Sequence, residues 1–264
     1  MDSTTRRFPS LVLTLIALFT PALGACNGDD ADVAPTLDAG PGDAALLPAS
    51  EYAVLVRGTL FTADMAMAQV RHDAIAGGGR EAALAAGDFG HDVVLGTTML
   101  GTAENQFAAI DRWHDIGAAR AFYGDPMIAG AFATLFSGPP SLETFERQGD
   151  WTAWGDLDTI DQTAPHYFIV ARGHLAASTT AESRDAHNAL VSATEDMARA
   201  AGDVGHVVYL GTEDPREFLA VDIWPTSDVI VPFYSNPDFQ AAIGSLFDAP
   251  QTIGVYQGTN WAQW

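Results

Sequence analysis

The amino-acid sequence predicts an α+β protein built from two tandem copies of one β-α-β-β-α-β unit. The first observation behind this prediction is a repeated stretch: Ala86-Gly-Asp-Phe-Gly-His-Asp-Val-Val-Leu-Gly-Thr97 returns as Ala201-Gly-Asp-Val-Gly-His-Val-Val-Tyr-Leu-Gly-Thr212. The second is that the apolar residues around each stretch change between helical and strand spacing in the same order. A repeat of this length is considered first, because it decides how every other element is interpreted.

The two copies align almost without gaps from Glu51 to the end of the chain. The offset is 115 residues (206 − 91) through the second strand and 111 residues (224 − 113) from the third strand onward. The slip falls between Thr97 and Asp111, where a hairpin loop can absorb it. The copy ends also match, as Gln148-Gly-Asp-Trp-Thr-Ala-Trp154 and Gln257-Gly-Thr-Asn-Trp-Ala-Gln-Trp264. We expect these tryptophan pairs to latch one copy onto the other.

Each element of the second copy has a local signal, and the first copy follows the same order. Strands are indicated by β-branched and aromatic residues, and the start of the first helix by the capping residues Ser178 or Thr179. We expect strands over 167–172, 206–210, 217–224 and 252–257, and a second helix over 228–247 that is broken near Asn236-Pro237.

The first copy differs in the middle of its first helix. Gly77-Gly78-Gly79 lies there, where the second copy has Ser192-Ala-Thr194. Each glycine costs a helix about 1 kcal/mol relative to alanine, so we expect three of them to break or fray this helix. The second copy is therefore the better candidate for a working pocket.

The order β-α-β-β-α-β is the split βαβ, or ferredoxin-like, unit. Its helices cover one face of a four-stranded sheet and leave the other face bare. Two tandem units can cover each other's bare faces, so we expect the two sheets to pack face to face as a pseudo-dimeric α/β barrel. Because that barrel closes within one chain, we expect a monomer.

The chain begins with a targeting segment. Arg6-Arg7 precedes an apolar run from Leu11 to Phe19 that is too short to span a bilayer. Leu23-Gly-Ala-Cys26 then resembles the lipobox of bacterial lipoproteins, which implies that Cys26, the only cysteine, is lipidated. The alternative is a buried cysteine that follows an ordinary signal peptide.

These signals divide the chain into a signal peptide over 1–25, an acidic flexible tether over 26–50, a first repeat with linker over 51–164 and a second repeat over 165–264. The tether has hardly any large apolar side chains and cannot offset its ordering entropy. Asn27 follows the cysteine, and resemblance to enterobacterial lipoproteins then implies the outer membrane. We expect a lipid-anchored protein of the bacterial cell envelope.

Composition excludes several classes of function. The chain carries a formal charge of −22 and no lysine, so it is a poor partner for nucleic acid. It has no Ser-His-Asp order, P-loop, G-x-G-x-x-G or H-E-x-x-H motif, which leaves hydrolase, nucleotide-binding and zincin functions without support. The expected partner is a small-molecule ligand.

The third strand and second helix carry a family resemblance. Asp222-Ile-Trp224, Phe233-Tyr-Ser-Asn-Pro237 and Leu246-Phe247 correspond to Asp111-Arg-Trp113, Phe122-Tyr-Gly-Asp-Pro126 and Leu135-Phe136. This pattern resembles the dimeric α/β-barrel superfamily and, within it, the antibiotic-biosynthesis-monooxygenase-like (ABM-like) domains. The resemblance covers about residues 51–264. It departs from the family where many members place a histidine on the second helix, because this chain has Phe233-Tyr234 there.

His72 and His187 are the candidate catalytic residues. Each lies in the first helix of its copy, beside the apolar face, and a histidine there can transfer protons near neutral pH. The alternative is a structural histidine that binds a backbone carbonyl or a carboxylate. His91 and His206 open the second strands, and for them we favour a loop contact in which Asp88 or Asp203 hydrogen-bonds the turn.

A second group of side chains is expected to bind substrate. Arg57 and Arg172 end the first strands and can hold an anionic group, with a structural pair to Asp88 or Asp203 as the alternative. Four aromatic residues are expected either to line an apolar pocket or to fill the core: Trp113, Trp224, Tyr123 and Tyr234.

A metal site was considered for the second copy, where His174 adds a third histidine to His187 and His206. A right-handed β-α-β crossover places His174 and His206 at opposite sheet edges. Zinc bonds of about 2 Å cannot bridge that gap, so we expect no metal.

Three functions remain. The resemblance implies a cofactor-independent, oxygenase-type enzyme that acts on a small apolar or aromatic molecule. The same pocket could serve a non-catalytic ligand-binding lipoprotein. Relatives that bind or degrade haem supply the third, which the missing second-helix histidine disfavours. We expect no cofactor, and a pocket in the second copy between its first helix and its sheet, with His187 at the centre.

Overall fold

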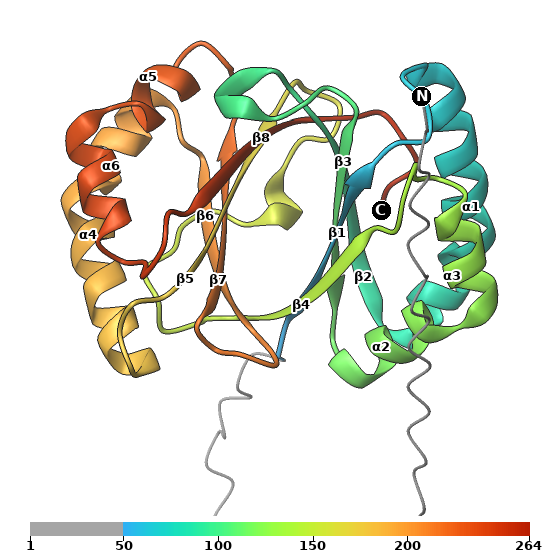
Figure 1. Ribbon diagram of the computed structural model, residues 1–264, viewed down its shortest axis with the longest axis horizontal. Helices are drawn as coiled ribbons and strands as arrows, with labels where there is room; N and C mark the ends of the chain where they lie inside the picture. Colours follow the sequence, from blue (N-terminus) through green and yellow to red (C-terminus); the bar gives the residue numbers. More distant parts are fainter. Residues whose placement is uncertain (1–49) are drawn as a thin grey trace, which may run out of the picture. The chain divides into compact units, whose positions relative to one another are not determined.

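A closed eight-stranded barrel carries three helices on each of two opposite sides (Figure 1). It is seen in a computed structural model that describes residues 50–264. The signal peptide, Cys26 and the tether up to residue 49 lie outside the described residues. Within 50–264, no helix is both long enough and apolar enough to cross a membrane.

The strands and helices follow the predicted order in both repeats. The first repeat contains β1 (Tyr52–Thr59), α1 (Met65–Ala86), β2 (Asp88–Gly96), the 3-10 turn η1 (Met99–Gly101), β3 (Gln106–Trp113), α2 (Ile116–Gly124), α3 (Pro126–Ala133) and β4 (Ser141–Arg147). A linker with the 3-10 turn η2 (Leu157–Thr159) leads to the second repeat. That repeat contains β5 (Tyr167–His174), α4 (Thr180–Ala201), β6 (Gly205–Gly211), β7 (Glu217–Trp224), α5 (Ile230–Tyr234), α6 (Pro237–Gly244) and β8 (Thr252–Gly258).

The predicted barrel is confirmed, and its strands pair in the order β1-β3-β2-β8-β5-β7-β6-β4 with β4 returning to β1. The two four-stranded sheets do more than face each other. Their edges join through β2–β8, where Val94 pairs with Gly258, and through β4–β6, where Phe145 pairs with Gly211. Closure therefore leaves neither repeat with a free sheet edge.

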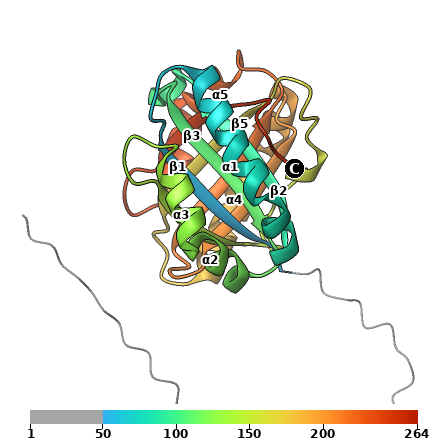
Figure 2. The same ribbon diagram turned by 90° about the vertical axis from the view of Figure 1, so that its right-hand side faces the viewer.

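Strand alternation separates two apolar regions. Ala53 and Leu55 of β1 belong to a cluster that receives residues from all eight strands and fills the barrel interior. Val54 and Val56, which point the other way, pack with the helices of the first repeat. Figure 2 shows α1 to α3 lying over that outer face of the sheet. The cluster of Ala53 and Leu55 packs the middle of the barrel interior.

The linker closes one end of the barrel. Leu157 is buried in the interior cluster, Asp158 pairs with Arg112 of β3, and the Gln162 amide donates to Asp92 Oδ1 of β2 at 2.7 Å. The opposite end, where β1 and β5 finish, has no such cover from the linker.

The expected break of the first helix is wrong. Helix α1 runs through Gly77-Gly78-Gly79 and has 22 residues, the same length as α4. Asp64 caps its start, Gly87 caps its end, and Ala68 and Ala83 pack it against the sheet. Because tertiary packing supplies most helical stability, these contacts outweigh the glycine cost.

The second helix is broken as predicted. Residues Ile230–Tyr234 and Pro237–Gly244 form separate helices, and the Asn236 side chain caps the second by accepting from the Asp238 and Phe239 backbone N–H groups. Proline at the first helical position suits such a start.

Candidate functional site

Each repeat contains two buried histidines that face each other. In the second repeat, His187 Nε2 of α4 lies 3.2 Å from His206 Nε2 of β6. In the first, His72 Nε2 of α1 lies 3.3 Å from His91 Nε2 of β2, and the two rings are within 2° of parallel. The site thus joins the predicted catalytic histidines to two histidines for which we had favoured only a loop contact.

Each pair continues into a carboxylate and a tyrosine. His206 Nδ1 hydrogen-bonds to Asp222 Oδ1 of β7, and the Tyr234 hydroxyl of α5 donates to Asp222 Oδ2 at 2.5 Å. The first repeat forms the same linkage. We call each set a His–His–Asp–Tyr chain; the two chains are His187–His206–Asp222–Tyr234 and His72–His91–Asp111–Tyr123.

Strand register brings together the histidine and the aspartate of each His–His–Asp–Tyr chain. His206 lies directly opposite Asp222 on the β6–β7 pair, so the two side chains share one face of the sheet. Tyr234 ends α5 and returns to the same carboxylate. The family pattern in the sequence includes Asp222 and Tyr234, but it contains no signal that His206 joins them, because cross-strand register is not local.

The hydrogen bonds determine which nitrogen of His187 carries a proton. Asn188 Oδ1 accepts the Thr152 N–H at 2.7 Å, so this atom is the amide oxygen. It also lies 3.1 Å from His187 Nδ1, which must therefore donate. Burial, with the charge of His206, lowers the pKa of His187 to about 4, so the ring is neutral at pH 7. His187 Nε2 then carries the lone pair and accepts from His206 Nε2.

In the first repeat, the carboxylate of Asp73 takes the place of the Asn188 amide. Asp73 Oδ1 accepts the Ala262 N–H at 2.7 Å and lies 3.1 Å from His72 Nδ1. Burial lowers the pKa of His72 to about 4 despite this carboxylate. For His91, burial opposes the charged form, but the charge and hydrogen bond of Asp111 outweigh it and raise the pKa.

The tryptophan pairs latch the repeats together, and they do so reciprocally. Trp154, near the end of the first repeat, packs against His206 in a tilted arrangement with ring centroids 4.9 Å apart and exchanges backbone hydrogen bonds with it. Trp264, which ends the second repeat, lies 4.5 Å from the ring of His91. Each histidine pair is therefore covered by the tail of the other repeat.

A second aspartate lies beside each His–His–Asp–Tyr chain. Asp203 Oδ1 accepts the Gly205 N–H at 3.0 Å, and Asp88 Oδ1 accepts the Gly90 N–H at 3.1 Å, which are the predicted turn contacts. Burial and the charge of Asp222 raise the pKa of Asp203 to about 8. Burial and Asp111 likewise raise the pKa of Asp88 to about 7. The predicted turn contacts of both residues are confirmed, and no local sequence signal indicates that burial brings the pKa values of these two carboxyl groups close to neutral pH.

A cavity of about 50 Å³ lies in the second repeat between α4, the α5–α6 pair and the helix-side face of the sheet. Its polar lining consists of His187, His206, Asp222, Tyr234, Asp203 and Thr194, and its apolar lining includes Leu190, Phe233 and Phe239. The equivalent cavity of the first repeat measures about 30 Å³. Either space holds a few water molecules, well below the roughly 300–1,000 Å³ of ligand pockets.

The other predicted binding residues lie elsewhere. Trp113 and Trp224 are fully buried in the helix-side core and do not line the cavities, whereas Tyr123 and Tyr234 do. Arg57 and Arg172 both pair with Glu143 of β4, not with Asp88, Asp203 or the cavity. Ala171 lines the cavity, so its neighbour Arg172 points to the opposite face, into the barrel.

His174 lies apart from the other two histidines of the second repeat. It pairs with Glu217 at the start of β7, whereas His206 pairs with Asp222 near its end. Within residues 50–264, His174, Asp214 and Glu217 place three candidate metal-ligand atoms within 4.8 Å of one another, at the surface. His174 Nδ1 also lies 2.7 Å from Asp248 Oδ2, and this ion pairing satisfies the ring without a metal.

The arrangement of strands and helices has known counterparts. A provisionally named monooxygenase of Fusobacterium nucleatum superposes with a TM-score of 0.58 at 8% identity, over 83% of this chain and 99% of that one. The fold is that of the dimeric α/β barrels. An anthrone oxidase-like protein also gives a TM-score of 0.58, at 14% identity over 81% and 93% of the two chains.

A chlorite dismutase variant from Candidatus Nitrospira defluvii superposes less well, with a TM-score of 0.49 at 12% identity over 78% and 91% of the chains. The sequence matches no protein-family model and no curated protein. At 8% and 14% identity, the likeness to the two proteins with TM-scores of 0.58 establishes the fold alone.

Proposed function

We propose that this protein is an oxygenase-type enzyme that needs no bound cofactor and oxidises a small apolar or aromatic molecule in the cavity of the second repeat. One observation carries the proposal. Asp203 and His187 line the same apolar cavity, and their pKa values are displaced in opposite directions, to about 8 and about 4. Environments that separate the pKa values of neighbouring groups are typical of acid–base sites.

The two groups have distinct roles in such a reaction. Ionised Asp203 takes a proton from an activated CH₂ group of the substrate, because its pKa lies close to the working pH. His187 Nε2 accepts a hydrogen bond from a substrate hydroxyl in place of His206. Dioxygen adds to the resulting carbanion, and loss of water leaves a carbonyl, so CH₂ and O₂ give C=O and H₂O. The likeness to an anthrone oxidase-like protein supports this class of reaction.

Substrate entry requires movement of the outer wall. That wall consists of the short helices α5 and α6, whose Phe233, Phe239 and Ile243 line the cavity. The break at Asn236 and Pro237 provides a hinge between them. A cavity of about 50 Å³ has room for dioxygen or a few water molecules, and displacement of α5 and α6 would make room for an aromatic ring.

Haem does not fit the described site. Both ring nitrogens of His187 and both of His206 are engaged within the chain, so neither histidine offers an axial ligand without breaking its hydrogen bonds. We derive no step through haem.

A non-catalytic ligand-binding protein is the second candidate. The complete hydrogen bonding of the histidines favours this function, because a fully hydrogen-bonded network of side chains can shape and rigidify the pocket without taking part in chemistry.

Oxygen uptake with anthrone as the probe distinguishes these functions. We expect uptake that rises with pH through about 8, and Asp203→Asn should reduce it at least about a hundredfold. The matched Asp88→Asn variant reports on the first repeat, and loss of activity there would move the site to that repeat. Saturable anthrone binding without uptake would favour the binding function. Absence of both would remove the proposal.

We also propose that the chain is exported and lipid-anchored at Cys26, and that it acts as a monomer in the cell envelope, where it meets its small-molecule substrate. The support is the lipobox-like Leu23-Gly-Ala-Cys26 behind an apolar run. A Cys26→Ser variant should move from the detergent phase to the aqueous phase, or stay unprocessed, in a detergent partition assay. Membrane fractionation like that of the wild type would exclude the anchor.

A further inference from the structure

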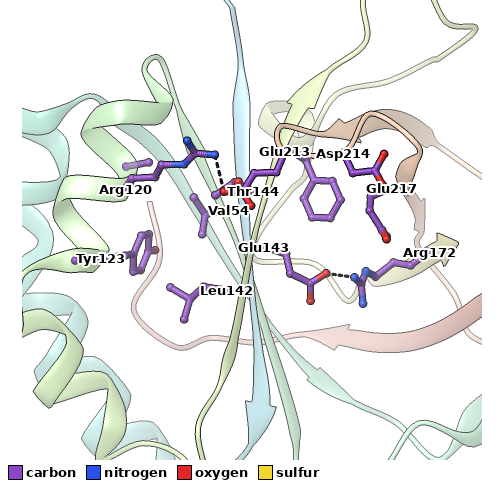
Figure 3. Close-up of a pocket in the computed structure, with 14 residues that line it drawn as sticks. Val54, Arg120, Tyr123, Leu142, Glu143, Thr144, Arg172, Glu213, Asp214 and Glu217 are labelled. Atoms are coloured by element: carbon purple, nitrogen blue, oxygen red, sulfur yellow. Dashed lines mark hydrogen bonds and ion pairs between the residues drawn. The ribbon is translucent and has the colours of Figure 1, made fainter. Parts of the chain in front are cut away.

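The barrel end that the linker leaves uncovered carries an unusual group of charges. Arg57 of β1, Arg172 of β5 and Glu143 of β4 each lie two residues from a member of the interior cluster, so all three point into the barrel. Figure 3 shows Glu143 and Arg172 directed at one another. The two arginines are equivalent positions of the two repeats (172 − 57 = 115).

These two guanidinium groups share one carboxylate. Arg57 Nη2 lies 2.9 Å from Glu143 Oε1, and Arg172 Nη2 pairs with Glu143 Oε2. The Nε atoms of both arginines are buried and have no hydrogen-bond partner. Burial and the charge of Arg57 lower the pKa of Arg172 to about 10, so Arg172 remains charged at neutral pH. The side chains of Arg57, Arg172 and Glu143 together carry one positive charge in excess, and Glu217 of β7 is a further carboxylate that acts on Arg172 from the other side.

The excess arises from a break in the internal symmetry. The position equivalent to Glu143 in the second repeat is Gly254 (254 − 143 = 111), so one of two symmetric carboxylates is missing. Phe145 is replaced by Tyr256 in the same way, and this ring lies over Gly254, where a Cβ would approach it to 2.6 Å. No carboxylate of the second repeat balances the second arginine from that position.

A hollow of about 410 Å³ opens beside the two arginines. We call it the arginine hollow, and its polar lining is Arg57, Arg172, Thr102, Gln106, Gln251, Thr252 and Tyr256. None of its lining residues is acidic. The adjoining hollow of Figure 3, about 680 Å³ in volume, instead contains Glu143, Glu213, Asp214 and Glu217. An anion is therefore attracted to one side of the Arg172–Glu143 pair and repelled from the other.

We propose that the arginine hollow binds the carboxylate of a small organic acid, at a site separate from the helix-side cavity. A carboxylate matches the fork of a guanidinium group, as Glu143 already shows, and a monoanion neutralises the single excess charge. The hydroxyl and amide groups of the lining complete its hydrogen bonds. Because Ala171 lines the cavity and Arg172 the hollow, the two sites occupy opposite faces of β5.

Calorimetric titration of the full-length protein with benzoate tests this site, with benzamide as the neutral isostere. Benzoate should bind and benzamide should not. Arg57→Gln and Arg172→Gln should each weaken benzoate about tenfold or more, as loss of a charge-assisted hydrogen bond does. Glu143→Gln should tighten binding several-fold, because it removes the competing carboxylate. Arg120 is a surface residue that lines the adjoining hollow of Figure 3, and Arg120→Gln should leave the affinity for benzoate unchanged.

Two outcomes would overturn the proposal. One is benzoate binding that neither arginine variant weakens, in proteins whose melting temperatures match the wild type. The other is binding that Glu143→Gln fails to tighten, which keeps the test decisive if the arginine variants do not fold. Inorganic phosphate is titrated in parallel, and phosphate binding tighter than benzoate would contradict the assignment to a monoanionic carboxylate.

Discussion

At the scale of single residues, the main feature is that each repeat keeps a neutral imidazole in a buried, fully hydrogen-bonded position. His72 and His187 are 4% and 2% exposed, and each donates from Nδ1 and accepts at Nε2. Protonation would add a charge and remove the acceptor for the Nε2–H group of the partner histidine. The pKa of both histidines is therefore lowered to about 4, with burial as the largest cause.

This burial makes stability depend on pH through His187. Its folded pKa of about 4 lies below the unfolded value of 6.5, so the unfolded chain binds more protons between these pH values. The His187 contribution to the free energy of unfolding is present above pH 6.5 and is lost as the pH falls to 4. The stability advantage of the wild type over His187→Gln should therefore shrink by about 3 kcal/mol between pH 7 and pH 4.

Urea unfolding of both proteins at several pH values measures this difference, with His114→Gln as a surface control. The raised pKa of Asp203 works in the opposite direction, since its ionisation opposes folding as the pH rises toward 8. That contribution is common to the wild type and the variant and cancels in the comparison. A stability gap that does not change with pH would contradict the neutral, buried His187.

At the scale of elements, each repeat has a short C-terminal segment, its tail, that packs on the histidines of the other repeat. The tails are residues 151–154 and 261–264, and each site therefore contains residues of both repeats. Trp151 and Trp154 follow β4 of the first repeat, yet they pack on His187 and His206 of the second. The same tail supplies the Thr152 N–H that orients Asn188. A tail that binds the other repeat also holds the two halves together.

Single tryptophan changes should reveal this exchange. Trp151→Ala should cost about 3 kcal/mol of stability and shift the imidazole resonances of His187, whereas Trp261→Ala should shift those of His72. Histidine-selective NMR of both variants measures the effect. If each change perturbed the histidines of its own repeat, the exchange of tails would be wrong.

At the scale of the whole described molecule, closure of the barrel removes every sheet edge and buries the inner faces of both sheets. The β2–β8 and β4–β6 pairs join the repeats, and the interior cluster draws on all eight strands. Neither half can satisfy these strands or cover this apolar surface alone.

Expression of residues 51–150 alone should therefore give a fragment that aggregates or forms dimers with itself. Residues 51–264, which contain both repeats, are the control and should do neither. The fragment exposes the edges of β2 and β4 and loses the second-repeat tail that covers His72 and His91. Light scattering and a thermal melt check the outcome. A monomeric fragment with a cooperative melt would show that closure is not required.

Local signals in the sequence were enough to predict the duplication and the order of the elements. The cap at Thr179, the break at Asn236 and Pro237, and the turn contacts of Asp88 and Asp203 each depend on neighbours within a few residues. Helix α1 is the exception, because its glycines act locally while its stability comes from packing. The family resemblance placed Asp222 and Tyr234 on the right elements without linking them to a histidine.

The sequence alone therefore determined that this protein is a duplicated ferredoxin-like unit with histidines at matching positions. Only the tertiary structure decided what those positions do. Strand register placed His206 against Asp222, exchange of tails placed Trp154 on His206, and barrel closure brought Arg57 and Arg172 to one carboxylate. The physical reason is that hydrogen bonds and burial act between side chains that meet in space, whereas periodicity and capping report only on neighbours along the chain.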